Sequence, residues 1–157
     1  TQQFLASMLH ESVSQASLEI PTHPLPFSTV AVLDDDEDVA VSIAHNLQRA
    51  GFRAFAYSSE HGLLEGAVAD PFDAVIADWM LGRGTALAVV ATLRSIERYR
   101  DIPLVVLSGN LCLNGEPTCP ELRKAIVEYG LIFRSKPRRT ADLVADIRPL
   151  AHRDERA

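Results

Sequence analysis

The chain contains 157 residues, of which 47% are hydrophobic, and it carries a formal net charge of −6 at pH 7. This is enough for one domain with an ordinary core and a short extension, and the negative charge argues against nucleic acid as a direct partner. The sequence shows neither a run of the roughly 18 apolar residues that a membrane span needs nor a secretory leader pattern. We therefore expect a cytoplasmic protein without a membrane span.

Three regions differ in their pattern, and we place their boundaries at 1–27, 28–150 and 151–157. The first region combines an apolar stripe with prolines that rule out a continued helix, so it predicts a helix followed by a stiff linker. The stripe consists of Leu5, Met8, Leu9 and Val13, and the prolines are Pro21, Pro24 and Pro26. The second region is the expected domain, and the third is a short tail.

Apolar strands alternate with amphipathic helices through the second region, which is typical of a parallel sheet covered on both faces. The expected strands are 30–33, 53–57, 72–77, 103–107 and 132–135. The expected helices are one that ends at Gly51, 60–68 with a Ser59 cap, 86–100 with Leu87, Val90, Leu93 and Ile96 on one face, 120–129 ended by Gly130, and one from a Thr140 cap to Pro149. The pattern predicts an α/β fold with a doubly wound, five-stranded parallel sheet.

Polar side chains follow four of these strands. Asp34 and Asp35 follow the first strand, Asp78 the third, Ser108 the fourth and Lys136 the fifth. Because the carboxyl ends of parallel strands meet at one edge of a sheet, we expect these side chains to lie close together. Crowded carboxylates repel one another and lose hydration, and a hard cation such as Mg²⁺ is the simplest reason to keep them. Carboxylates, a hydroxyl and a lysine in this order predict a phosphoryl-transfer site.

These four motifs, separated along residues 28–150, resemble the receiver domain of bacterial two-component response regulators. The resemblance implies a flavodoxin-like receiver fold with strand order 2-1-3-4-5. It also implies that Asp34, Asp35, Asp78 and the main-chain carbonyl of Met80 hold Mg²⁺, and that Asp78 accepts the phosphoryl group.

The resemblance implies further roles for three residues. Ser108 and Lys136 would contact the phosphoryl group, and Ser108 would move toward it as part of a switch. Phe133, the aromatic residue three positions before the lysine, would change rotamer with Ser108; plain core packing of Phe133 is the equal alternative.

The partner implied is a sensor histidine kinase or a histidine phosphotransfer protein. The output partner is not identified, and a homodimer is left open, as is the choice between a single-domain regulator and the receiver part of a hybrid kinase. The chain departs from the family in the 81–84 loop, which replaces a proline-containing loop, and in the longer spacing of 28 positions from Ser108 to Lys136. The excess falls at 112–120, beside the fourth helix, where the output surface is expected.

Two other functions compete with a receiver. The spacing of Asp34 and Asp36, followed by Ser108 and Lys136, resembles the haloacid dehalogenase-like phosphatases. That family needs a further acidic pair after the lysine, and within the expected domain only Asp142 and Asp146, both expected on a helix, follow Lys136. A pseudo-receiver that keeps the fold as an interaction module is the third interpretation.

Two further features remain ambiguous. We expect Cys112 and Cys119 to be reduced thiols in a loop, with a redox-sensitive disulfide as the alternative. The stretch around His10 resembles the phosphoacceptor box of sensor histidine kinases, but the residues that follow differ from that box. We therefore expect His10 to be an ordinary surface histidine, with a kinase remnant as the alternative.

Overall fold

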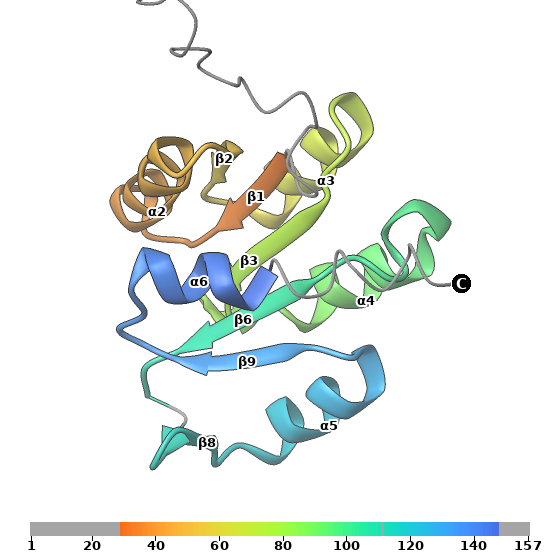
Figure 1. The fold of residues 1–157 in the computed structure, drawn as a ribbon. Coiled ribbons are helices and arrows are strands. Elements are labelled where there is room, and N and C mark those ends of the chain that lie inside the picture. Colours follow the sequence, from red (N-terminus) through yellow and green to blue (C-terminus); the bar gives the residue numbers. More distant parts are fainter. Residues whose placement is uncertain (1–28, 111, 148–157) are drawn as a thin grey trace, which may run out of the picture.

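Five parallel strands form the central sheet, with the order β2-β1-β3-β6-β9 (Figure 1). The strands are β1 (Thr29–Leu33), β2 (Arg53–Tyr57), β3 (Ala74–Asp78), β6 (Leu104–Ser108) and β9 (Ile132–Ser135). The predicted order 2-1-3-4-5 is confirmed, because the intervening labels belong to two short hairpins. The computed structural model describes residues 29–110 and 112–147. The predictions for residues 1–27, His10 and the 151–157 tail lie outside this range.

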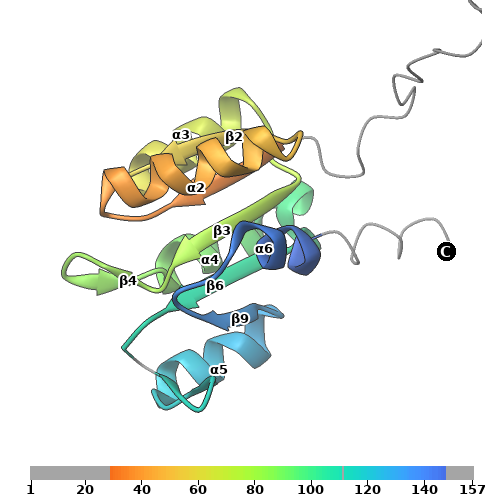
Figure 2. The same cartoon turned by 60° about the vertical axis from the view of Figure 1, so that its left-hand side comes forward.

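Helices cover both faces of the sheet (Figures 1 and 2). They are α2 (Glu37–Arg49), α3 (Glu60–Ala69), α4 (Leu87–Ser95), α5 (Pro120–Tyr129) and α6 (Thr140–Ile147), with a 3₁₀ turn, η1 (Glu97–Tyr99). One core cluster lies between the sheet and α2 with α6, and the other lies between the sheet and α3, α4 and α5. Within the described ranges, no helix has the length and apolar character needed to span a bilayer.

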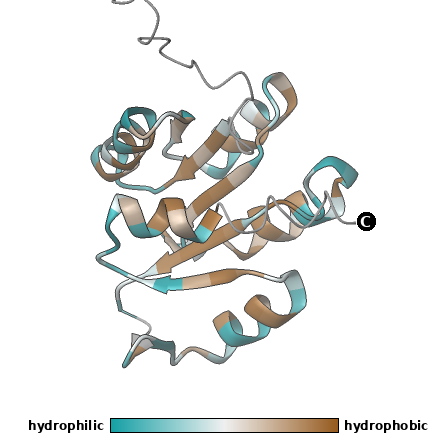
Figure 3. Cartoon of the chain, viewed as in Figure 1, coloured by the Kyte–Doolittle hydropathy of each residue, from teal (hydrophilic) through white to brown (hydrophobic). Residues whose placement is uncertain are grey.

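The central strands are apolar on both sides, as their colour in Figure 3 shows. Ala31 and Leu33 face the cluster under α3 and α4, whereas Val30 and Val32 face the cluster under α2 and α6. Because successive side chains of a strand point to opposite faces, a strand buried on both sides needs apolar residues at every position. This explains why the strands could be recognised as continuous apolar runs.

Polar side chains and glycines mark the helix ends. The Asp36 carboxylate accepts hydrogen bonds from the backbone N–H groups of Asp38 and Val39 and so caps α2. The predicted Ser59 cap is confirmed, because its hydroxyl accepts from the Gly62 N–H at 3.1 Å. The predicted stops at Gly51 and Gly130 are confirmed by their φ angles of 99° and 61°. The predicted Thr140 cap is displaced, since α6 begins at Thr140 itself.

The predicted 86–100 helix is wrong beyond Ser95. Helix α4 ends at Ser95, and Ile96 is extended, with φ −92° and ψ 125°. Ile96 is therefore 38% exposed instead of continuing the buried face. The chain then turns through η1 and buries Tyr99, whose hydroxyl donates to the Ala67 carbonyl of α3. This contact between distant segments outweighs the local helical periodicity.

Two segments expected as loops form short antiparallel hairpins. Strands β4 (Met80–Leu81) and β5 (Gly84–Thr85) pair directly after β3, and β7 (Cys112–Leu113) pairs with β8 (Glu116–Pro117) before α5. Asn114 and Gly115 both have positive φ, the backbone that a two-residue hairpin turn requires. Cys119 is a half-buried free thiol, and the side chain of Cys112 lies outside the described part of the chain.

The Arg94 side chain joins three segments at one end of the domain. Its guanidinium donates to the carbonyls of Tyr129 at 2.8 Å, Tyr99 at 3.0 Å, Ile102 at 2.7 Å and Gly130 at 3.4 Å. Burial lowers the pKa of Arg94, and the charge of Asp101 acts in the opposite direction. The guanidinium thus ties the end of α4 to η1 and to the end of α5.

We predict that Arg94→Met lowers the free energy of unfolding by about 2–3 kcal/mol, because several carbonyls lose their donor at once. Urea unfolding followed by circular dichroism measures this change. Arg100→Met is the matched control, since Arg100 is exposed, and it should change stability by less than about 0.5 kcal/mol. Equal effects of the two substitutions would show that the Arg94 contacts contribute little.

Candidate functional site

Carboxylates gather at the carboxyl edge of the sheet. Asp34 directly follows β1, Asp35 comes next, and Asp78 is the last residue of β3. One carboxylate oxygen from each lies within 4.8 Å of the others. Asp34 is 3% exposed and Asp78 is partly buried, whereas Asp35 is open to solvent. The structure therefore brings together the three carboxylates that the sequence pointed to.

Lys136 reaches into this cluster from the end of β9. Its Nζ lies 3.0 Å from Asp34 Oδ2 and 3.4 Å from Asp78 Oδ2. The backbone N–H of Lys136 donates to the Ser108 carbonyl at 3.0 Å, which places the end of β9 beside the end of β6. The peptide bond to Pro137 is cis. One ammonium group thus bridges carboxylates from two strands.

Burial and neighbouring charges shift the pKa values of this pair. Burial raises the pKa of Asp78, the charge of Asp34 raises it too, and Lys136 and the Met80 backbone N–H act in the opposite direction. Desolvation alone would lower the pKa of Lys136, but the hydrogen bonds and charges of Asp34 and Asp78 together raise it. Ionised Asp78 therefore costs folding stability at neutral pH, as is common at functional sites.

The β4–β5 hairpin closes back onto the acidic residues. The backbone N–H of Gly82, in the hairpin turn, donates to Asp35 Oδ2 at 2.9 Å. Gly82 has φ 54°, a backbone conformation that residues with a Cβ rarely adopt. The sequence indicates only that this loop departs from the receiver family, and it does not predict the contact with Asp35. The Gly82-Arg83-Gly84 sequence could have indicated a tight turn, but not its target.

The carboxylates fit a hard divalent cation. Mg²⁺ prefers oxygen ligands and keeps several waters, so one or two carboxylates are enough to hold it. Both oxygens of Asp34 already accept hydrogen bonds, from the Asp36 N–H and from Lys136. Asp34 is 3% exposed, whereas Asp35 is exposed and Asp78 is only partly buried, so Asp35 and Asp78 are the best placed direct ligands and Asp34 adds its charge beside them.

Two of the other predicted residues, Ser108 and Met80, lie beside this cluster. Ser108 is buried at the end of β6, in register with Ser135 of β9. Met80, two positions after Asp78, is 42% exposed, and its backbone N–H donates a hydrogen bond to the Asp78 carboxylate. Phe133 is partly buried and packs against the core cluster beneath α3, α4 and α5.

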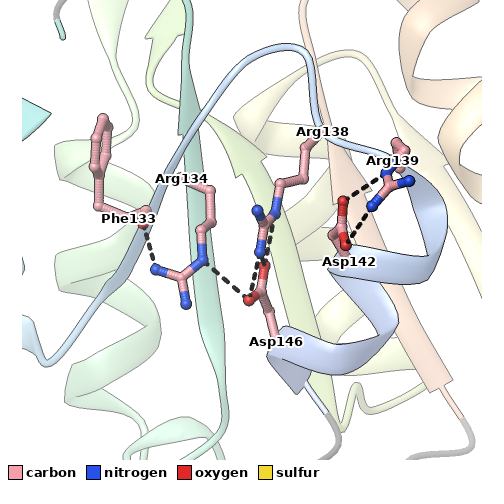
Figure 4. A network of polar contacts seen from close by, with 6 residues as sticks. All are labelled: Phe133, Arg134, Arg138, Arg139, Asp142 and Asp146. Atoms are coloured by element: carbon pink, nitrogen blue, oxygen red, sulfur yellow. Dashed lines mark hydrogen bonds and ion pairs between the residues drawn. The ribbon is translucent and has the colours of Figure 1, made fainter. Parts of the chain in front are cut away.

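The acidic residues that a phosphatase would need are engaged elsewhere. Asp36 caps α2. Asp146 accepts hydrogen bonds from Arg134 and Arg138, and Asp142 pairs with Arg139 (Figure 4). These two aspartates therefore bind arginines on the face formed by β9 and α6.

Solved structures with this fold provide the comparison. CheY4, a chemotaxis protein of Vibrio cholerae, is 22% identical, with a TM-score of 0.67 over 78% of this chain and 98% of its own. A receiver domain protein from Methanospirillum hungatei JF-1 is 16% identical, with a TM-score of 0.69 over 82% of this chain and 96% of its own. The chain has the receiver-domain fold.

A third structure of this fold is the signal receiver domain of a signal transduction histidine kinase from Syntrophus aciditrophicus. It is 18% identical, with a TM-score of 0.66 over 83% of this chain and 94% of its own. No protein-family model and no curated protein matches the sequence. The assignment of the receiver fold therefore depends on the arrangement of the helices and strands. In the sequence, the four strand-end motifs indicated this fold.

We predict that Mg²⁺ changes the fluorescence of Trp79, the single tryptophan, because it is buried directly after Asp78. Asp35→Asn should weaken Mg²⁺ affinity at least about tenfold, since a charged ligand is lost. Asp38→Asn, an exposed change in the first turn of α2, is the control and should leave the titration unchanged. Identical titrations of the two variants would remove Asp35 from the metal site.

Proposed function

We propose that this domain is a phosphoacceptor receiver of a two-component phosphorelay. Asp78 takes a phosphoryl group from a histidine kinase or a histidine phosphotransfer protein in a Mg²⁺-dependent reaction, in the cytoplasm. The transfer switches a surface that binds another protein, so the domain acts as a signalling module and not as an enzyme with a separate substrate. The observation that carries the proposal is the Lys136 bridge between Asp34 and Asp78 at the carboxyl edge of a receiver fold.

The chemistry follows from the charges around Asp78. Its carboxylate oxygen attacks the phosphorus of a phosphohistidine, forming an acyl phosphate as the phosphorus–nitrogen bond breaks and the imidazole leaves. Asp35 and Asp78 would hold Mg²⁺, whose charge would offset the repulsion between carboxylate and phosphoryl oxygens. Lys136 lies 3.4 Å from the Asp78 carboxylate, so its ammonium is placed to bind a phosphoryl oxygen after transfer.

The switch would begin at the end of β6. Ser108 lies beside Lys136 through the backbone bond between the two strands, and its hydroxyl can donate to the phosphoryl group. Movement of Ser108 would change the packing of β6 against β9, on which Phe133 lies. Phe133 contributes to both the core and the surface beside α5, so it is the candidate that transmits the change.

The geometry favours the receiver over both alternatives. A haloacid dehalogenase-like phosphatase needs Asp36 and a later acidic pair in the site, but these residues cap α2 and bind arginines. A pseudo-receiver would have no need for a partly buried Asp78 with a raised pKa or for a lysine held between two carboxylates.

We predict that acetyl phosphate with Mg²⁺ adds one phosphate to the protein, and that Asp78→Asn abolishes this gain. Intact mass spectrometry measures both. Asp101→Asn is the control because Asp101 is exposed near the opposite edge of the sheet, and it should label like the wild type. A phosphate that remains in Asp78→Asn would show that Asp78 is not the phosphoacceptor. Turnover of p-nitrophenyl phosphate would favour a phosphatase, and no labelling at all would favour a pseudo-receiver.

We predict that Lys136→Met abolishes labelling or the fluorescence change that follows it, while the protein stays folded. The substitution removes the cation that offsets Asp34 and Asp78 but keeps an apolar stem. Lys124→Met is a matched control, because Lys124 is the other lysine of the chain and is exposed on α5. Labelling kinetics by mass and Trp79 fluorescence are the readouts, and normal behaviour of Lys136→Met in both would exclude it from the site.

A further inference from the structure

An apolar groove lies between α3 and α4, at the opposite edge of the sheet from the carboxylates. Its volume is about 420 Å³, and it is lined by Leu64, Ala67, Val68, Pro71, Thr92, Ile96, Arg98 and Tyr99. Val68 is 86% exposed and Ile96 is 38% exposed, although both belong to this apolar surface. Helix α4 ends before Ile96, which the sequence did not predict, and this early end opens one side of the groove. Apolar side chains gathered in one concave surface indicate a binding site.

The polypeptide enters the domain beside this groove. The backbone N–H of Thr29, the first described residue, donates to Asp73 Oδ2 at 3.0 Å, and the Asp73 N–H donates to the Thr29 carbonyl at 2.9 Å. The other Asp73 oxygen pairs with Arg98 at 3.3 Å, and Arg98 lines the groove. Asp73 thus connects the start of β1 to the rim of the groove.

The 28 residues that precede Thr29 have a composition suited to binding in this groove. The stripe Leu5, Met8, Leu9 and Val13 supplies apolar side chains at helical spacing, and the segment contains no lysine or arginine that would repel Arg98. Residues 21–28, with three prolines, can span about 25 Å if extended. Since Thr29 lies next to the rim of the groove, this reach is sufficient to return the stripe to the groove.

We propose that the apolar stripe of residues 5–13 docks in the groove between α3 and α4 of the same chain. A covalent tether of this length provides an effective concentration in the millimolar range, so a contact too weak to persist between separate molecules can be populated. Docking covers Val68 and Ile96, two of the exposed apolar side chains of the domain. The proposal does not depend on phosphorylation of Asp78, because the groove and the carboxylates lie at opposite edges.

Hydrogen exchange of the full chain, read by mass spectrometry, tests this docking. In the wild type, amides of residues 5–13 should exchange roughly three- to tenfold more slowly than in Val68→Glu, which places a charge in the groove. Val127→Glu is the matched control: Val127 is 85% exposed on α5, so the same change there should preserve the protection. Leu9→Glu, which leaves the domain unchanged, should accelerate exchange in 5–13 and expose the ends of α3 and α4.

Three outcomes overturn the proposal. Exchange of residues 5–13 at the unprotected rate in the wild type would show that the stripe does not dock. Equal loss of protection in Val68→Glu and Val127→Glu would place the contact elsewhere. Protection that grows with protein concentration, together with a dimer in sedimentation velocity, would assign the groove to a second copy of the chain.

Discussion

Repulsion among the carboxylates at the sheet edge is the constraint around which the site is built. Asp34 and Asp78 end up close together because β1 and β3 are neighbours whose carboxyl ends coincide. Neither charge can move away, since each is attached to a strand buried on both faces. Lys136, carried in by β9, supplies the cation that makes this arrangement tolerable, and its raised pKa keeps it charged. The remaining negative charge is of the kind that fits a hard cation.

The core supplies the free energy that this charged edge costs. Apolar side chains fill both faces of β1, β3 and β6, so the strand ends are held rigidly. A rigid edge fixes the distances between Asp34, Asp78 and Lys136 in advance of any ligand. The β4–β5 hairpin and the exposed Asp35, which surround the site, are joined by the hydrogen bond from the Gly82 N–H to Asp35 Oδ2.

The two edges of the sheet serve different purposes. The carboxyl edge gathers charged groups, whereas the opposite edge is held by the Arg94 contacts and by the bonds of Asp73 to Thr29 and Arg98. Helices of the α3–α4 side end at that second edge, which is where their apolar surfaces meet in a groove. Binding of a segment in this groove leaves the geometry of the carboxylates undisturbed, because the groove and the carboxylates lie at opposite edges.

The sequence by itself determined the five strands to within two residues, and the three central strands are continuous apolar runs because they are buried on both faces. The order of the strands followed from the resemblance to receiver domains. The sequence also predicted that Asp34, Asp35, Asp78 and Lys136 lie close together, because the carboxyl ends of parallel strands lie at the same edge of a sheet. Tertiary contacts decided the rest. Burial of Tyr99 ended α4 early. The Gly82 bond to Asp35 joins residues 47 positions apart, and the energy of such contacts depends on three-dimensional placement that local periodicity does not encode.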